Sequence, residues 1–318
     1  MQGADNAKNF ISVVICTFNR CAELDGALKS LLKLECDSSF DYEIIVVDNN
    51  SKDDTKKMVE SYMAQFHGRL KYVLEAKQGL SNARNRGIRE SRGNIIAYVD
   101  DDCIIEAEWL IYLDKTFKKY DADLVGGKIL PLWLKKPSKW IFRKYIMGKL
   151  SLLDYGDNEF HVTKKEEEPY GANMAFKKSS LIESGLFKGE LGRTGNNLFA
   201  GEETELFLQF LNNGKRIYYQ PKAVVHHKVL PMRMKKSYFR NRCFDGGRTK
   251  VLMEKSAVNY ATFFKIPKFL FKDLITSAGR YLWALIRFNG EMIFFQELDI
   301  CYVLGRMYEY RKRNNTVL

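Results

Sequence analysis

The 318-residue sequence lacks the features of several common protein classes. Its six cysteines form no C-x-x-C pair, so we expect reduced thiols rather than a zinc site or disulfides. The longest apolar candidate for a membrane span, residues 269–288, is interrupted by four charged side chains. Residues Met1–Asp5 lack a basic segment followed by an apolar one, so we also expect no secretory signal.

Two glycine-rich phosphate-binding signatures are absent as well. No G-x-G-x-x-G follows the first predicted strand, and no G-x-x-x-x-G-K-S/T occurs anywhere. These absences disfavour a dinucleotide-binding fold and a P-loop enzyme. The phosphates of any bound ligand would have to be neutralised by a metal ion and by side chains.

Positive charge is concentrated at the C-terminal end of the chain. The net charge is +12, and residues 228–318 contain 18 Lys+Arg against 7 Asp+Glu, whereas the preceding residues contain 33 and 32. The mixture of cationic, aromatic and aliphatic residues in this tail suits helices lying on an anionic membrane surface. RNA binding and a plain helical domain or dimer interface are the alternatives. We expect no nucleic-acid partner, because no RNA-binding module is recognisable.

Strand and helix patterns alternate through the first 130 residues. This order predicts an α/β fold with a parallel sheet, helices on both of its faces and ligands bound outside the carboxyl ends of the strands. Ser51, with Asp54 three residues later, is expected to cap one of the helices. The predicted strands are 11–17, 42–47, 70–74, 95–99 and 124–130, and the other helices are 22–34, 81–91 and 106–120.

Three carboxylates, Asp100, Asp101 and Asp102, follow the apolar strand 95–99 directly. Like charges at the end of a buried strand repel one another, and a divalent cation such as Mn²⁺ or Mg²⁺ would offset that cost. The alternative is a solvated acidic turn before the next helix. Because the polar loops Thr17–Arg20 and Asp48–Asn50 end neighbouring strands, they should converge on the same edge and favour a metal–diphosphate site there.

Three other residues could complete such a site. Arg84 lies on a predicted helix whose N-terminus and guanidinium suit a phosphate. Glu203 shares a helical row with apolar side chains, which suits a general base, although acidic residues are common in the first turn of a helix. At the end of the predicted strand 223–225, we favour His227 over His226 as a third metal ligand.

Taken together, these motifs resemble the inverting family 2 glycosyltransferases of the GT-A fold, over about residues 10–250. The matching segments are Thr17–Arg20, Val47–Ser51, Gly79–Asn85, Tyr98–Asp102, Gly171–Met174, Gly201–Leu206 and Pro221–His227. The resemblance implies a Rossmann-like, mostly parallel sheet flanked by helices, followed by a basic helical appendage. It divides the chain into a catalytic domain, residues 1–230, with a nucleotide-sugar half at about 10–130 and an acceptor half at 131–230, and the appendage, residues 231–318.

The resemblance also implies roles for individual residues. Thr17 and Asp48 would contact the nucleotide base and Asp100 the ribose, while Asp102 would hold Mn²⁺ or Mg²⁺. Glu203 stands where the family usually has an Asp acting as base, so Glu202 could share that task. The remaining expected contacts to the nucleotide-sugar donor come from Asn19, Arg20, Arg84 and Asp101.

The implied reaction is inverting transfer of a sugar from a nucleotide-diphosphate sugar to a glycan or lipid-linked acceptor, in cell-surface polysaccharide or lipid-linked glycan synthesis. We expect a cytoplasmic enzyme, peripheral on the inner face of the cell membrane. One alternative is a nucleotidyltransferase. The other is a catalytically degenerate protein that acts as a glycan-binding scaffold.

Overall fold

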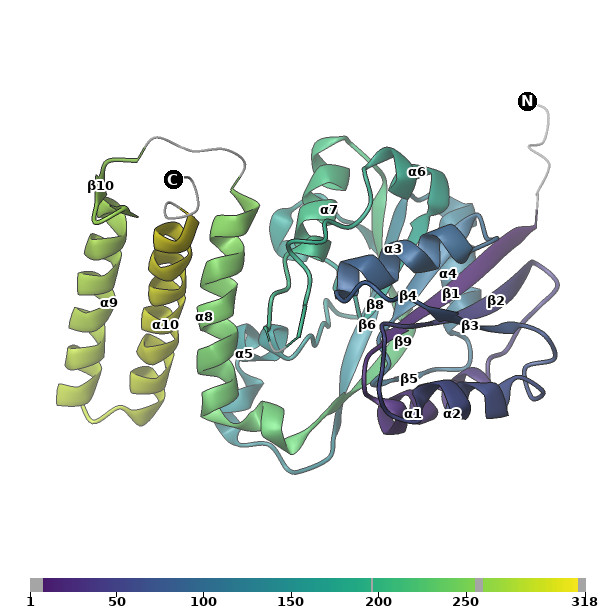
Figure 1. The fold of residues 1–318 in the computed structure, drawn as a ribbon, viewed down its shortest axis with the longest axis horizontal. Helices are drawn as coiled ribbons and strands as arrows, with labels where there is room; N and C mark the ends of the chain where they lie inside the picture. Colours follow the sequence, from purple (N-terminus) through teal and green to yellow (C-terminus); the bar gives the residue numbers. More distant parts are fainter. Residues whose placement is uncertain (1–7, 196, 255–259, 314–318) are drawn as a thin grey trace. The chain divides into compact units, whose positions relative to one another are not determined.

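A mixed β-sheet is the centre of the computed structural model, which describes residues 8–195, 197–254 and 260–313 (Figure 1). The residues on which we predicted the absence of a secretory signal lie outside these ranges. The strand order is β3-β2-β1-β4-β8-β6-β9-β5, and β7 pairs with β9. The strands are β1 (Asn9–Thr17), β2 (Phe40–Asp48), β3 (Leu70–Leu74), β4 (Ile95–Val99), β5 (Cys103–Ile105), β6 (Leu124–Trp133), β7 (Phe160–His161), β8 (Asn173–Lys177) and β9 (Ile217–Val229).

The first four strands in this order pair in parallel, as the alternating pattern predicted. β1 pairs in parallel with both β2 and β4, and β2 with β3. Beyond β4 the sheet becomes antiparallel, because β8 runs against both β4 and β6, and β9 against both β5 and β7. The predicted α/β architecture is thus confirmed, and the antiparallel half is an addition that the sequence pattern did not predict.

Helices cover both faces of the sheet, with α3 and α6 on one face and α1 and α2 on the other (Figure 1). The apolar core under α3 includes Ala83 and Ile88 of that helix and joins Val14 of β1 to Phe210 of α7. The helices associated with the sheet are α1 (Cys21–Leu31), α2 (Thr55–Tyr62), α3 (Leu80–Glu90), α4 (Trp109–Tyr120), α6 (Lys178–Glu183) and α7 (Glu202–Asn212).

A buried asparagine ties three parts of this core together. Asn173 is fully buried; its Oδ1 accepts a hydrogen bond from Trp109 Nε1 at 2.8 Å, and its Nδ2 donates to the carbonyls of Lys128 and Ala223. Gly127 leaves room for this amide, since a Cβ there would lie 2.3 Å from Asn173 Nδ2. With every amide group satisfied, Asn173 fixes α4, β6 and β9 relative to one another.

Two local expectations were wrong. Ser51 does not cap α2, which begins at Thr55; the Ser51 hydroxyl instead accepts a hydrogen bond from the Asn19 N–H at 2.9 Å. The short strand predicted at residues 223–225 is part of a longer strand, β9, because Pro221 inside it does not interrupt the extended backbone. His226 and His227 therefore lie within a strand rather than at its end.

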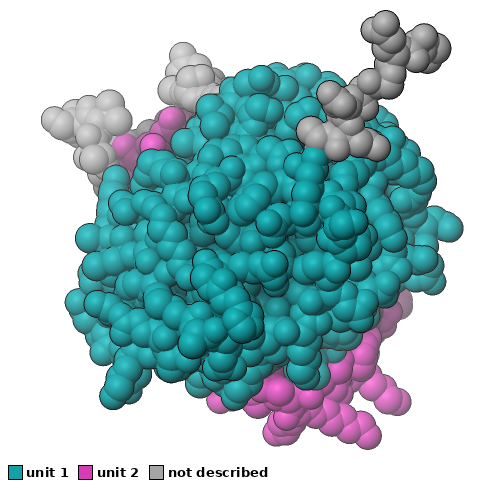
Figure 2. All heavy atoms as spheres, turned by 90° about the vertical axis from the view of Figure 1, so that its right-hand side faces the viewer, with its two compact units in different colours: residues 1–132, 151–189, 203–228 teal, residues 133–150, 190–202, 229–318 magenta. Residues whose placement is uncertain are grey.

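The chain divides into two compact units, coloured teal and magenta in Figure 2. Unit 1 comprises residues 1–132, 151–189 and 203–228, and unit 2 comprises residues 133–150, 190–202 and 229–318. The predicted domain boundary at residue 230 is close to the point where the last segment of unit 2 begins. The short segments 133–150 and 190–202, which we had assigned to the acceptor half, group with the C-terminal region.

Unit 2 is helical. Its core includes Val251, Leu270, Val303 and Tyr310. Gly305 lets α8 and α10 approach closely, because a Cβ at this position would lie 1.9 Å from the Phe244 carbonyl oxygen. The elements of unit 2 are α5 (Lys144–Lys149), α8 (Lys236–Met253), β10 (Thr262–Phe263), β11 (Ile266–Pro267), α9 (Lys268–Ile286) and α10 (Gly290–Arg313).

Trp140 packs inward in unit 2. Its ring meets Phe239 and Phe294 edge to face, with centroid distances of 5.3 and 5.0 Å. Among the described helices, none combines the length and the apolar character needed to cross a membrane.

Candidate active site

The site is built around the carboxyl end of β4, all of which is buried. The chain turns directly after Val99, and the Cys103 N–H bonds back to the Asp100 carbonyl at 3.2 Å. Asp101 and Asp102 are buried at this turn, whereas 37% of the Asp100 side chain is exposed. All three carboxylates thus lie at one rim of the sheet, where ligands of open α/β sheets bind.

Arg20 offsets part of this negative charge. Its Nη1 lies 2.6 Å from Asp101 Oδ1 and its Nη2 lies 2.8 Å from Asp102 Oδ2, so one guanidinium bridges both carboxylates. The Thr17 hydroxyl donates to the other oxygen of Asp101 at 2.8 Å. The structure therefore places Thr17, Arg20 and Asp101 together, with Asp101 holding the other two side chains in position.

Burial raises the free-energy cost of ionising the carboxyl groups at this rim. Desolvation raises the pKa of Asp101 to about 7 and outweighs the opposing effect of the Arg20 charge. Desolvation also raises the pKa of Asp100, and the negative charge of Asp102 adds to that rise. A bound cation would offset this cost by stabilising the ionised form of the carboxylates.

The short strand β5 explains how His227 reaches the same place. β5 pairs with β9 so that Cys103 is opposite His227, one residue after Asp102. His227 is 1% exposed and its Nε2 lies 3.2 Å from Asp102 Oδ1. The neighbouring His226 has the opposite orientation, as expected in a strand, and its Nε2 contacts Glu106 Oε1 at 2.9 Å.

Asp100, Asp102 and His227 form a set of donors that fits a divalent cation. Each offers one ligand atom, and these atoms lie within 4.8 Å of one another. Carboxylate oxygens suit Mg²⁺ and Mn²⁺, and an imidazole nitrogen is better tolerated by Mn²⁺. The chemistry of the residues present therefore fits the metal that we predicted.

Glu203, at the start of α7, is held next to these carboxylates by Arg84. The Arg84 guanidinium forms an ion pair with Glu203 and lies 4.0 Å from Asp100 Oδ1. The Gly171 N–H donates to Glu203 Oε2 at 2.9 Å. The Arg84 side chain is 2% exposed and lies 5.2 Å from the Phe187 ring centroid, so a packed cation positions the Glu203 carboxylate.

Gly171 is required for this arrangement. A Cβ at position 171 would lie 1.8 Å from Glu203 Oε1 and 2.4 Å from Arg84 Nη2. The absence of a side chain at Gly171 thus lets the Glu203 carboxylate lie close to the backbone. Glu202 differs from its neighbour, because it groups with unit 2, where its carboxylate accepts from the Gly201 N–H at 3.1 Å.

The loops after β1 and β2 are connected by reciprocal hydrogen bonds. The Asn19 N–H donates to Ser51 Oγ at 2.9 Å, and the Lys52 N–H donates to Asn19 Oδ1 at 2.7 Å. Asn19 has a φ of 51°, a left-handed conformation that asparagine tolerates better than most residues. This turn carries Asn19 onto the neighbouring loop.

Asp48, at the end of β2, accepts hydrogen bonds from the Ser51 N–H and from the Tyr72 hydroxyl, both at 2.8 Å. The analysis of the sequence missed Tyr72. Tyr72 lies in the short strand β3, and a position in a strand does not indicate which side chain its hydroxyl contacts.

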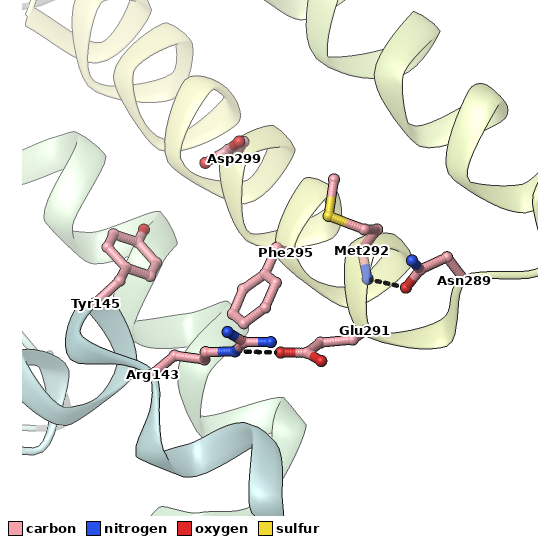
Figure 3. Close-up of a pocket in the computed structure, with 7 residues that line it drawn as sticks. All are labelled: Arg143, Tyr145, Asn289, Glu291, Met292, Phe295 and Asp299. Carbon is pink, nitrogen blue, oxygen red and sulfur yellow. Dashed lines mark hydrogen bonds and ion pairs between the residues drawn. The ribbon is translucent and has the colours of Figure 1, made fainter.

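Unit 2 contains a cavity of about 500 Å³ that includes none of the predicted site residues (Figure 3). Arg143 and Glu291 form an ion pair across it at 2.5 Å. Its lining consists of Arg143, Tyr145, Asn289, Glu291, Met292, Phe295 and Asp299. Nothing in this lining resembles the carboxylate and imidazole set of unit 1.

Comparisons with known proteins identify the family of the chain. Residues 12–185 match the family Glycosyl transferase family 2. The chain is 26% identical over 253 residues to a glucosyl-dolichyl phosphate glucuronosyltransferase of Haloferax volcanii, covering 77% of each protein. It is also 26% identical over 249 residues to the succinoglycan biosynthesis protein ExoM of Rhizobium meliloti, covering 77% of this chain and 76% of that protein.

Solved structures support the fold. The mannosyltransferase PcManGT from Pyrobaculum calidifontis, determined in complex with GDP-Man and Mn²⁺, aligns with a TM-score of 0.63 at 14% sequence identity. The alignment covers 96% of this chain and 89% of that one. Because the family match extends over more than half of the sequence, the chain belongs to glycosyl transferase family 2, and its sheet and helices form the GT-A fold predicted from the motifs.

Proposed function

We propose that this protein transfers a sugar from a nucleotide-diphosphate sugar to an acceptor hydroxyl, with inversion at the anomeric carbon. The observation that carries the proposal is the position of Glu203, which Arg84 holds beside Asp100 at the rim that also contains Asp102 and His227. A base and a cation-binding set at one place are what this reaction requires.

Asp100, Asp102 and His227 would hold Mn²⁺ or Mg²⁺. When bound, the cation supplies positive charge that stabilises the diphosphate leaving group. The two connected loops, with Asn19 and Asp48, would receive the nucleotide. Thr17 and Arg20 would act together with Asp101, to which both are bonded.

Glu203 would act as the general base. Its ion pair with Arg84 favours the carboxylate form, which can accept the proton of the acceptor hydroxyl. The hydroxyl oxygen forms the new bond to the anomeric carbon, and the electron pair of the old carbon–oxygen bond leaves with the nucleoside diphosphate. Attack opposite the leaving group inverts the configuration, and a second carboxylate nucleophile is unnecessary.

The named relatives support the kind of acceptor that we propose. One relative is named for a dolichyl phosphate substrate and another for succinoglycan biosynthesis. A lipid-linked or polysaccharide acceptor at the inner face of a cell membrane is consistent with both names.

A panel of UDP-, GDP- and dTDP-sugars, screened by thermal shift with and without Mn²⁺, tests donor binding. We expect one nucleotide class to stabilise the protein in a metal-dependent way. The Glu203→Gln variant should keep that stabilisation but lose transfer by about 100- to 10,000-fold, because the amide cannot accept the proton. Glu203→Asp should retain part of the activity.

The control is Glu183→Gln, which changes a 64% exposed side chain paired with Lys215. It should leave transfer unchanged. Full activity in Glu203→Gln would assign the base elsewhere, and a product with retained anomeric configuration by NMR would exclude the inverting mechanism. Donor binding without turnover on any acceptor would instead favour the scaffold hypothesis.

A further inference from the structure

The helix α9 exposes a line of large apolar side chains. Ile275, Leu282, Trp283 and Ile286 are 72%, 58%, 56% and 69% exposed. Their spacing, with Gly279 between them, places all of them on one side of an α-helix. We call Ile275, Gly279, Leu282, Trp283 and Ile286 the outer stripe.

The opposite side of α9 already has its partners within unit 2. Leu270 is fully buried, Ser277 is 7% exposed and Ala284 is 4% exposed. Leu270 belongs to the core shared with Val251 of α8 and Val303 of α10. The outer stripe is therefore additional to the apolar face that stabilises the fold.

Exposed aromatic side chains lie near both ends of the helix. Phe288, two residues after α9 ends, is 94% exposed. Phe263 and Phe264, in the β10–β11 hairpin before α9, are 54% and 76% exposed. Exposed large apolar side chains along one side of a helix and near both of its ends are more typical of an interaction site than of isolated surface residues.

The charges around the outer stripe are almost all positive. Residues 263–288 contain five Lys+Arg and one acidic residue, Asp273. Arg306 lies 3.6 Å from Asp273 and offsets its charge. The Arg287 guanidinium lies over the Trp283 ring, 4.5 Å from its centroid, which places a cation directly on the stripe. Lys268, Lys272 and Arg280 are also exposed.

We infer that α9 lies flat on an anionic lipid bilayer, with the outer stripe at the boundary between headgroups and acyl chains. Apolar side chains flanked by Lys and Arg, with a tryptophan among them, fit that boundary. The stripe extends over about 16 Å of helix, which suits a surface contact. A second copy of the chain fits less well, because two surfaces of the same positive sign would repel each other.

This surface goes beyond the proposed sugar transfer and does not depend on it. Cations near an anionic bilayer add electrostatic attraction, and the apolar side chains add the burial of apolar surface. Membrane docking would bring the protein to acceptors that carry a lipid.

Vesicle sedimentation tests the inference on the full chain. We expect the protein to bind vesicles of phosphatidylglycerol and phosphatidylcholine at least about 10-fold more strongly than vesicles of phosphatidylcholine alone. At about 0.5 M salt the binding should be severalfold weaker, because salt screens the attraction between the cations and the anionic headgroups. The triple variant Ile275→Ser, Leu282→Ser, Ile286→Ser should lose at least about 10-fold in binding to the anionic vesicles.

The matched control carries Leu32→Ser, Met63→Ser and Ile182→Ser. These side chains, which are 38%, 38% and 55% exposed, lie in unit 1. The control should bind vesicles like the wild type. Equal binding by the wild type and the α9 variant, or equal losses in the variant and the control, would overturn the inference.

Trp283 provides an independent readout. Its fluorescence should shift to the blue on anionic vesicles and be quenched by brominated lipids, and the fluorescence shift should disappear in Trp283→Phe while sedimentation persists. Binding without quenching would contradict the inferred orientation. If analytical ultracentrifugation shows a wild-type dimer that the triple variant dissociates, the occupant is a second copy and the inference is wrong.

Activity separates this inference from the proposed function. Transfer to a water-soluble acceptor without vesicles should be the same in the triple variant and the wild type, whereas Glu203→Gln should bind vesicles normally. Far-ultraviolet circular dichroism and melting temperature establish that the triple variant is folded.

Discussion

The rim of the sheet and the outer stripe of α9 are both regions that suit a binding partner, but they differ in kind. At the rim, Asp100, Asp102 and His227 each offer one ligand atom, and these three atoms lie within 4.8 Å of one another. On α9, four exposed apolar side chains and the surrounding cations would together form the inferred contact over a long surface. Binding at the rim should therefore be lost when one ligand atom is changed, whereas binding through the outer stripe should weaken gradually as side chains are replaced.

The largest effect should come from Asp102→Asn at the rim. The substitution removes a negative oxygen ligand at a 1% exposed position, so transfer should fall by about 1,000-fold and stabilisation by donor plus Mn²⁺ should disappear. Transfer assays and thermal shift measure both. Asp157→Asn, at a side chain that is 95% exposed, is the control. Equal donor-dependent stabilisation in Asp102→Asn and the wild type would remove the metal from this position.

Gly171→Ala should have the next largest effect. The added Cβ would displace the Glu203 carboxylate, so transfer should fall by about 10- to 100-fold while donor binding is retained. Gly279→Ala on α9 is the matched control, because a Cβ there meets nothing within 4 Å. If both substitutions leave transfer unchanged, the precise placement of Glu203 is not needed for catalysis.

The adjacent histidines allow a comparison within β9. His227→Ala should weaken Mn²⁺ binding by about 10-fold or more, whereas His226→Ala should leave it unchanged, because His226 contacts Glu106 instead. Isothermal titration of each variant with Mn²⁺ measures the difference. Equal losses would mean that neither imidazole acts as a direct ligand.

A single change in the outer stripe should have the smallest effect. Leu282→Ser should reduce binding to anionic vesicles only about two- to fivefold, because the remaining side chains still contact the bilayer. The free energy of unfolding should change by less than about 0.5 kcal/mol, since the side chain is mostly exposed. A total loss of binding from this one substitution would show that binding depends on Leu282 alone rather than on the whole outer stripe.

Much of the fold could be predicted because its signals are local. The alternation of apolar strands and amphipathic helices located β1, β2, β3 and β4, and the parallel order followed from that alternation. The antiparallel half was not predictable in the same way, because short strands such as β5 are defined by their pairing partners rather than by their own three residues. The prediction for Ser51 was wrong because its hydroxyl could either cap the next helix or accept a hydrogen bond from another loop. In the structure it accepts from the Asn19 N–H.

The candidate site shows the same limit. The residues gathered at the rim could be selected from the ends of predicted strands and from two predicted helices. The structure brings Asp100, Asp102, Arg84, Glu203 and His227 into one neighbourhood. The bridging of two carboxylates by Arg20 could not be predicted, nor could the hydrogen bond from Tyr72 to Asp48, because each depends on side-chain directions across different loops. The roles of all these residues in the reaction are predictions that the variants above test.

The reciprocal bonds between Asn19 and the Ser51–Lys52 segment also affect how this protein could be redesigned. Transplanting the first loop from a relative with another residue in place of Asn19 would remove the side-chain oxygen that accepts a hydrogen bond from the Lys52 N–H. A chimaera that exchanges only one of the two loops should therefore be disordered at both. The loops after β1 and β2 should therefore be exchanged together.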